Sequence, residues 1–242
     1  FPYTTLFRST GNFHEGNARM YTDYMLMTAA KNVTRDVSLV FDFIERPYSP
    51  VRFKELLVSP NEMKQKFSRL INEEIKNKQA GKPAYILIKI NHITDPVMVK
   101  KLYEASSHGV RIDLLVRGNC SLITGVPGVS DTIRINGIID RYLEHSRIFI
   151  FANGGDEKMF IGSADWMPRN LDNRVEVIAP VYDPEIKADL KRVVEYGLKD
   201  TLQGRVVDGT GENRPWISED KTAFRSQEEL YKYYLNENRI KD

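Results

Sequence analysis

The stretch RYLEHSRIFIFANGGDEKMFIGSADWMPRNLDNRVEVI, residues 141–178, says most about the fold. His145 stands at the start of an apolar, strand-like run, and Arg147 follows it two positions later. A Gly-Ser turn and a polar cluster come next, and the stretch closes on Glu176 inside another apolar run. Short apolar runs bounded by turn residues predict the strands of a packed sheet. A histidine and an arginine beside fixed polar groups suit phosphoryl chemistry.

Part of this pattern occurs twice in the chain. The pairs NF (12–13) and DW (165–166) each join a polar and an aromatic residue. An acid follows each pair eleven residues after its first member, Asp23 in one copy and Glu176 in the other. Self-similarity of this kind indicates duplicated structural units. We therefore expect an active site with pseudo-twofold symmetry between two related α/β units.

Strands and helices alternate along the chain. Apolar patterning predicts strands at Tyr21–Ala29, Tyr85–Ile90, Val110–Val116, Ile148–Phe151, Met159–Gly162 and Val175–Ala179. It predicts helices at Thr34–Ile44, 59–80, Pro96–Ser107, Pro184–Leu198 and Gln227–Asn238. The strand–helix–strand order over 85–116 indicates a parallel crossover. Residues 201–221 carry glycines and few large apolar side chains, which is typical of an extended surface connection.

The helix expected at 59–80 has the clearest start signal. Ser59 is a candidate N-cap, Pro60 fits the first helical turn, and Glu62 stands three residues after the serine. The helix should run to about Ala80 and stop at Gly81. We expect it to connect the two units.

Composition sets broad limits. A chain of 242 residues has room for one or two domains, and 41% hydrophobic with 28% charged residues is ordinary for a soluble protein. No apolar run approaches the ~20 residues of a membrane span, and no signal peptide pattern is present. The single cysteine, Cys120, excludes an internal disulfide and a multi-cysteine metal site. We expect a cytoplasmic location, with peripheral membrane association as an alternative.

The net charge of +2, from 35 basic and 33 acidic residues, does not indicate a polyanion partner. A phosphate site must therefore form where a few arginines converge in space. We expect no nucleic-acid partner, because nucleic-acid-binding proteins usually show a stronger basic bias.

Six segments of the chain resemble the polyphosphate kinase family. They are TGNFHEGNARMYTDYMLMTA (10–29), LLVSP (56–60), LIKINHITD (87–95), LYEASSHGVRIDLLVRGNCSL (102–122), RYLEHSRIFIF (141–151) and GSADWMPRNLDNRVEV (162–177). They follow the family's order, from residue 10 to about residue 204, and resemble its C-terminal portion. The resemblance implies an α/β fold of duplicated phospholipase D-like units, with a mixed or mostly parallel sheet flanked by helices.

The resemblance also implies a domain division. Residues 1–9 match nothing in the family and are expected to be a non-native tail. Residues 10–58 would end the first phospholipase D-like domain, 59–81 would form the connecting helix, and 82–242 would form the second such domain. The chain is then an N-terminally truncated fragment.

The implied activity is reversible transfer of the terminal phosphate of ATP to inorganic polyphosphate through a phosphohistidine. The family's phosphate-accepting histidine and its Mg²⁺ ligands lie upstream of this chain. We therefore expect the chain to be inactive alone and assign it no metal ligand. The expected partners of the intact protein are ATP, ADP and polyphosphate, and a homo-oligomer is expected.

Three residues match functional positions of the family. His145 would be a catalytic and phosphate-binding residue, since imidazole exchanges protons near neutral pH. Arg117 ends an apolar strand and would bind nucleotide phosphates, because a guanidinium contacts two oxygens at once. Tyr21 would hold the nucleotide base. The residues alone also allow a core or rim histidine, a surface arginine and a core tyrosine.

Weaker candidates surround these three. The side chains that could also reach phosphates are Arg147, Arg169, Arg174, Lys89 and Asn91, although Arg147 could equally pair with a carboxylate. The remaining histidines, His14, His92 and His108, are expected to be structural or exposed to solvent.

One departure separates the chain from phospholipase D-like hydrolases, which carry His-x-Lys in each half. The corresponding residues here are His145, Ser146 and Arg147, which favours the kinase branch. Two alternatives remain open: a phospholipase D-like phosphodiesterase or nuclease, and a non-catalytic fragment that binds polyanions.

Overall fold

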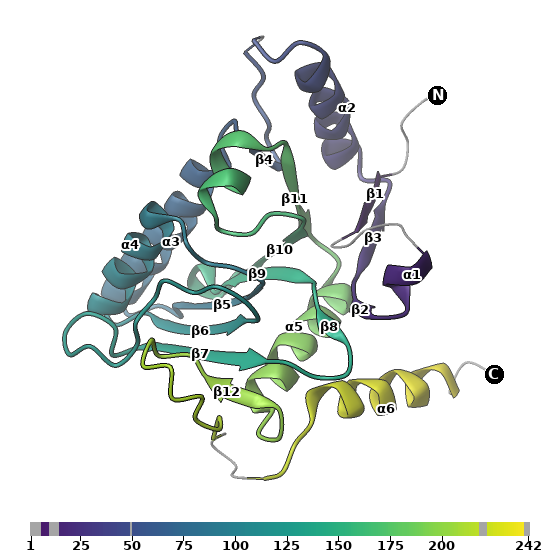
Figure 1. Ribbon diagram of the computed structural model, residues 1–242. Coiled ribbons are helices and arrows are strands. Elements are labelled where there is room, and N and C mark those ends of the chain that lie inside the picture. Colours follow the sequence, from purple (N-terminus) through teal and green to yellow (C-terminus); the bar gives the residue numbers. More distant parts are fainter. Residues whose placement is uncertain (1–5, 10–14, 49, 218–221, 240–242) are drawn as a thin grey trace.

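The computed structural model describes residues 6–9, 15–48, 50–217 and 222–239 (Figure 1). In these residues the main sheet has eight strands. Their order is β12 (Gly204–Val206), β7 (Ile133–Ile138), β6 (Arg111–Val116), β5 (Tyr85–Ile90), β9 (Arg147–Phe151), β10 (Lys158–Gly162), β11 (Glu176–Val181) and β4 (Leu57–Ser59). Strands β5, β6 and β7 are parallel neighbours, and the other neighbouring strands pair antiparallel. The sheet is therefore mixed.

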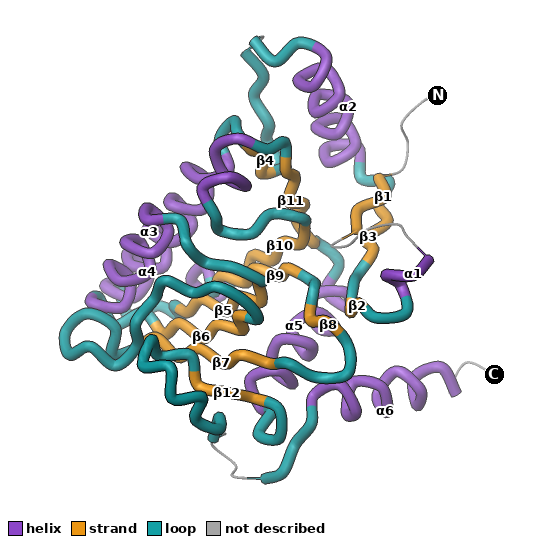
Figure 2. Tube along the Cα trace, in the orientation of Figure 1, coloured by secondary structure: helices purple, strands orange, loops and turns teal. Residues whose placement is uncertain are grey.

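Helices cover both faces of this sheet (Figure 2). Helices α3 (Met63–Gln79) and α4 (Pro96–Ser107) lie on one face, and α5 (Pro184–Lys199) lies on the other. Side chains alternate along β5, so that Ile86 and Ile88 join the α3–α4 core while Leu87 joins the α5 core. A strand buried on both faces reads as a continuous apolar run. The expected α/β class with a helix-flanked sheet is confirmed.

Smaller elements extend from this body. The N-terminal part contains β1 (Leu6–Ser9), α1 (Glu15–Ala18), β2 (Tyr21–Thr22), β3 (Met25–Thr28) and α2 (Lys31–Glu45). The remaining elements are β8 (Leu143–Glu144), the short helices η1 (Asn153–Gly155) and η2 (Arg169–Asn173), and the last helix α6 (Ser226–Arg239). Strands β1 and β3 pair antiparallel, and β2 and β8 pair parallel. No helix of the described residues is long and apolar enough to cross a membrane.

The single strand expected at Tyr21–Ala29 is wrong. The segment divides into β2, which pairs with β8, and β3, which pairs with β1. Asp23 lies between the two strands and contacts His145 instead of continuing a ladder. A strand pattern in sequence does not show that two successive parts have different partners.

The N-cap expected at Ser59 is also wrong. Ser59 ends β4, where it stands opposite Glu176, and its hydroxyl donates to the carbonyl of Asn170 at 2.5 Å. The helix begins four residues later, with Glu62 in the N-cap position. The end of the helix is confirmed, since α3 stops at Gln79 and Gly81 takes a φ of +69°.

The expectation of a plain connection over 201–221 is wrong in part, because β12 adds to the sheet beside β7. Strands β4, β7 and β8 were not expected at all.

Residues 6–9, for which no element was predicted, form β1. That residues 1–9 are a non-native tail stays a prediction, and the domain boundaries stay predictions as well. Other predictions hold closely, and the bounds of β5 and α4 are those expected from the sequence.

Candidate phosphate and nucleotide site

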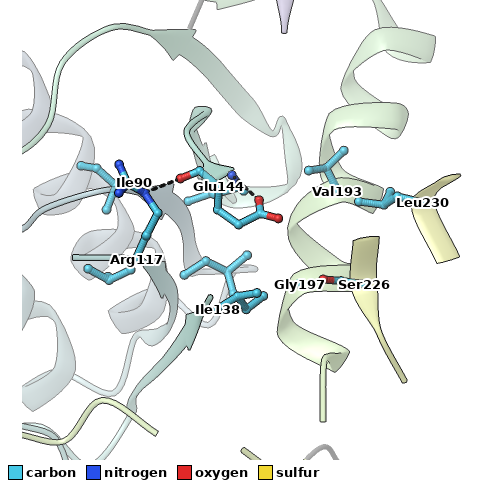
Figure 3. Close-up of a pocket in the computed structure, with 11 residues that line it drawn as sticks. Ile90, Arg117, Ile138, Glu144, Val193, Gly197, Ser226 and Leu230 are labelled. Carbon is cyan, nitrogen blue, oxygen red and sulfur yellow. Dashed lines mark hydrogen bonds and ion pairs between the residues drawn. The ribbon is translucent and has the colours of Figure 1, made fainter. Parts of the chain in front are cut away.

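Arg117 follows β6 at the carboxyl end of the parallel strands, where open α/β sheets usually bind ligands. Its Nε donates to the carbonyl oxygen of Glu144 (Figure 3), with an N···O distance of 2.7 Å, and to Oδ1 of Asn91 at 3.3 Å. Within the part of the chain that the structure describes, neither terminal nitrogen of this guanidinium has a hydrogen-bond partner. The side chain is therefore fixed at Nε while its two outer nitrogens stay available to an anion.

His145 lies between β8 and β9, with a partner on each ring nitrogen. Its Nδ1 is 3.1 Å from Oδ1 of Asp23, and its Nε2 is 3.3 Å from a terminal nitrogen of Arg147. A guanidinium only donates, so Nε2 accepts and the proton of the neutral ring lies on Nδ1, toward Asp23. A carboxylate on Nδ1 orients the imidazole and fixes its tautomer.

Tyr21 joins the other two residues. Its ring centroid lies 4.7 Å from that of His145, with the ring planes 50° apart. Tyr21 and Arg117 line one cavity of about 400 Å³, whose walls also include Met20, Ile138 and other residues of 138–144. The structure thus brings together the three residues predicted for the site, and the cavity has apolar walls with a guanidinium at its edge.

Arg147 pairs with a carboxylate, the second of the two roles expected for it. Its Nε and one terminal nitrogen reach the two oxygens of Asp165, each at 3.2 Å, and only 8% of the residue is exposed. Asp165 also accepts from the backbone N–H of Asn91 at 3.0 Å. This bidentate ion pair, together with the bond from Asn91 to Asp165, links β9 to the end of β5. It also fixes the guanidinium that donates to Nε2 of His145.

Three arginines lie close enough to His92 to affect its pKa, although the net charge of the chain is only +2. Burial lowers the pKa of His92; Asp165 opposes this shift, and Arg117, Arg169 and Arg147 reinforce it. Burial, with Arg147 next, also lowers the pKa of Arg117. Both Arg169 and Arg174 are exposed to solvent. Arg117, Arg147 and Arg169 thus lie near His92 at this end of the sheet, together with the carboxylate of Asp165.

Two of the remaining histidines have structural contacts. Nδ1 of His92 accepts the backbone N–H of Asn119 at 2.9 Å, and Nδ1 of His108 lies 2.8 Å from the carbonyl of Glu104 at the end of α4. His14 and the pair NF (12–13) lie outside the described residues.

The acid of the second repeat, Glu176, accepts from Asn170 at 2.8 Å and from Ser163 at 2.5 Å.

Lys89 is placed differently from its expected role as a phosphate ligand. It is 5% exposed and binds Oε2 of Glu144 at 2.9 Å and the hydroxyl of Ser146 at 2.6 Å. Glu144 was not predicted as a site component. The signal available in the sequence was its position directly before His145, within RYLEHSRIFIF (141–151).

The described residues contain no group of three or more His, Cys, Asp or Glu side chains able to hold a metal ion. The side chains described here therefore do not form a protein cage for Mg²⁺.

Two family models match most of the chain. The model of polyphosphate kinase C-terminal domain 2 matches residues 56–227, and that of C-terminal domain 1 matches residues 3–50. The chain belongs to the polyphosphate kinase family. The first match covers Arg117 and His145, and the second covers the segment that bears Tyr21 and Asp23. The second match begins at residue 3, so the expectation that residues 1–9 match nothing in the family is wrong for residues 3–9.

Individual relatives agree with this assignment. The polyphosphate kinase of Escherichia coli (strain K12) is 46% identical over 224 residues, which is 93% of this chain and 33% of that protein. The polyphosphate kinase of Porphyromonas gingivalis superposes with a TM-score of 0.91 at 40% identity, over 98% of this chain and 36% of the other. Phosphatidylserine synthase of Haemophilus influenzae shares the fold, with a TM-score of 0.58 at 12% identity over 99% of this chain and 67% of that one. The chain spans about a third of the length of the curated relatives it matches.

Proposed function

We propose that the intact protein transfers the terminal phosphate of ATP reversibly to inorganic polyphosphate, and that this chain supplies one half of the active site. One observation carries the proposal. In a chain of the polyphosphate kinase family, the outer nitrogens of Arg117, the ring of His145 and the ring of Tyr21 meet around one end of the sheet.

The cavity beside Tyr21 suits a nucleotide. Aromatic and aliphatic walls can take a purine base, because base–aromatic stacking is worth ~1–3 kcal/mol per base. Arg117 at the cavity edge can then contact two phosphate oxygens with its outer nitrogens. Its Nε contact with the carbonyl of Glu144 keeps the guanidinium plane fixed, so little side-chain entropy is lost on binding.

His145 is proposed to act on the transferring phosphoryl group. In the first step the bond between the terminal phosphorus of ATP and its bridging oxygen breaks, ADP leaves, and a P–N bond forms with a histidine upstream of this chain. In the second step the terminal oxygen of polyphosphate attacks that phosphorus and the P–N bond breaks. Held at Nδ1 by Asp23, His145 would exchange the contact of its Nε2 with Arg147 for a proton, and would then stabilise charge on the phosphoryl oxygens or protonate the departing one.

Mg²⁺ is proposed to accompany the triphosphate, with protein ligands upstream of this chain. When bound, it would neutralise charge on the phosphate oxygens. The roles proposed for Tyr21, Arg117 and His145 do not depend on it. We also propose a cytoplasmic, homo-oligomeric enzyme, in line with the family resemblance.

The experiment that tests this proposal needs the remaining two-thirds of an enzyme. A hybrid would replace the matching third of the Escherichia coli relative with this chain. Incubated with ATP, polyphosphate primer and a phosphodiester, the hybrid should release ADP and lengthen polyphosphate. Hydrolysis of the phosphodiester would support the phosphodiesterase alternative, and no reaction from a folded hybrid would support a chain that only binds polyanions.

A further inference from the structure

The two-residue strand β8 supports all three predicted site residues. Its last residue, Glu144, accepts Nε of Arg117 through its carbonyl, and His145 follows directly. Its first residue, Leu143, stands opposite Tyr21 in the parallel pair with β2, and its N–H donates to the carbonyl of Met20 at 2.7 Å. Any shift of β8 would therefore move the arginine, the histidine and the tyrosine together.

So short a strand pair cannot hold its own geometry, because isolated two-stranded pairs are marginal in water. The last helix, α6, supplies additional support through Gln227. The side-chain oxygen of Gln227 accepts the N–H of Tyr142 at 3.0 Å, and Nε2 donates to the carbonyl of Tyr142 at 2.8 Å. One amide side chain thus pairs with both backbone groups of the residue that precedes β8.

The same amide also holds the side chain of Glu144. Nε2 of Gln227 donates to Oε1 of Glu144 at 2.6 Å, while Oε2 accepts from Lys89 at 2.9 Å and from Thr22 at 3.2 Å. Burial would raise the pKa of Glu144, but Lys89, Gln227 and Thr22 hold it below its usual range. The carboxylate is ionised at neutral pH and is fixed by a β5 lysine, a β2 threonine and an α6 glutamine.

Helix α6 is itself anchored at its N-terminal end, so it can hold β8 in place. Its first residue, Ser226, gives its backbone N–H and its hydroxyl to the buried Asp200, at 2.8 and 2.7 Å. The preceding Arg225 reaches both oxygens of Asp140 at 2.6 and 2.9 Å. A cavity of about 20 Å³ lies between these elements, and Arg117, Glu144 and Ser226 are among the residues that line it (Figure 3). That volume holds about one water molecule, so packing leaves β8 little room to move.

We propose that Gln227 is a positioning residue for this site: from helix α6 it fixes β8, and through it the anion-binding geometry of Arg117 and the orientation of His145. Gln227 touches neither of them and is 9% exposed. The inference rests on the proposed function only for the identity of the ligand, a chain of phosphates.

The test uses the 242-residue chain with two near-isosteric variants, Gln227→Met and Gln227→Glu. Methionine fills the same space without hydrogen bonds. Glutamate keeps the acceptor for Tyr142 but places a second oxygen against Oε1 of Glu144. If Gln227 only filled space, glutamate would be tolerated at least as well as methionine. If it positions β8 by donating hydrogen bonds, Gln227→Glu must be the more damaging change. Asn236→Met, at an exposed amide on the same helix, is the matched control.

Two measurements read the site without requiring turnover. Calorimetry with inorganic tripolyphosphate should show binding about tenfold weaker in Gln227→Met, weaker still in Gln227→Glu, and unchanged in Asn236→Met. The ¹H–¹⁵N spectrum of the histidine rings, with His145 assigned by its loss in His145→Gln, should show a defined Nδ1–H tautomer in the wild type and tautomer averaging in both Gln227 variants. Thermal unfolding would confirm that each variant is folded.

Unchanged His145 signals and unchanged tripolyphosphate affinity in folded Gln227→Met and Gln227→Glu would overturn the inference. Equal damage from both variants would reduce Gln227 to a packing residue and would overturn it as well. If the wild-type chain bound no tripolyphosphate, the proposed phosphate site would fail, while the His145 spectrum would still decide whether Gln227 positions β8.

Discussion

Replacing Arg117 with lysine keeps the charge but should remove most of the phosphate affinity of this site. In the structure, Nε of Arg117 is occupied by the carbonyl of Glu144 at 2.7 Å, and the outer nitrogens are left for ligand. A lysine has one donor group for both tasks, because its three N–H bonds radiate from a single nitrogen. If its ammonium takes the carbonyl, the ligand loses at least one charge-assisted hydrogen bond.

The size of the effect follows from that count. A hydrogen bond to a charged group contributes ~1.5–3 kcal/mol, and each 1.4 kcal/mol changes a binding constant about tenfold. We expect Arg117→Lys to bind tripolyphosphate about 10- to 100-fold more weakly than the wild type in calorimetry. Arg111→Lys, at the other end of β6, is the matched control, since Arg111 is exposed and pairs with Asp113 at 3.0 Å. Equal affinity in Arg117→Lys and wild type would refute the assignment of Arg117 to the phosphate.

Four further predictions concern neighbouring groups. Tyr21→Phe should keep ATP affinity and Tyr21→Ala should lose ~1–3 kcal/mol of it, with tripolyphosphate binding unchanged as the internal control; equal ATP affinity in all three proteins would remove Tyr21 from the base site. In the hybrid enzyme, His145→Ala should lower turnover by ~10²-fold or more, and His145→Gln should rescue little; near-normal turnover of the folded His145→Ala enzyme would make this histidine structural. The chain alone, incubated with γ-labelled ATP, should acquire no acid-labile, base-stable phosphate, and such a label would show that it carries its own nucleophile. Lys89→Met should cost about 3–5 kcal/mol in urea unfolding, because it leaves the carboxylate of Glu144 buried without its cation; a loss below about 1 kcal/mol would contradict the buried pair.

The pH dependence of this ion pair has a defined sign. Glu144 has a folded-state pKa below its usual range, so its stabilising contribution is fully present above the unfolded value of about 4.3. The contribution is lost as the pH falls from that value through the folded pKa. Urea unfolding between pH 7 and pH 3 should therefore show a smaller decline in Lys89→Met than in the wild type.

Patterning along the chain predicted the elements whose own residues determine them. The bounds of β5 and α4 follow from a continuous apolar run and from Asp95 at the N-cap, which accepts two backbone N–H groups at 3.0 Å. Strands β8 and β12 were missed because they are two and three residues long and exist through their partners β2 and β7. Ser59 resembled a helix cap locally, but pairing with β11 outweighed that preference.

The site was predictable to the extent that its residues match family positions. Tyr21, Arg117 and His145 were named from the sequence, and the structure brings their side chains together. The contact between Glu144 and Gln227 could not be inferred, since 83 positions separate them and Gln227 lies outside the six segments that resemble the family. The pairing of Arg147 with Asp165 was one of two roles left open, and only the fold decides between them.

A crystal structure of this chain with bound ATP would locate the nucleotide directly. We expect the adenine against the ring of Tyr21, phosphate oxygens within hydrogen-bond distance of the outer nitrogens of Arg117, and the terminal phosphate facing Nε2 of His145. A nucleotide bound elsewhere, with Arg117 and His145 contacting no phosphate, would show that these residues do not form the nucleotide site.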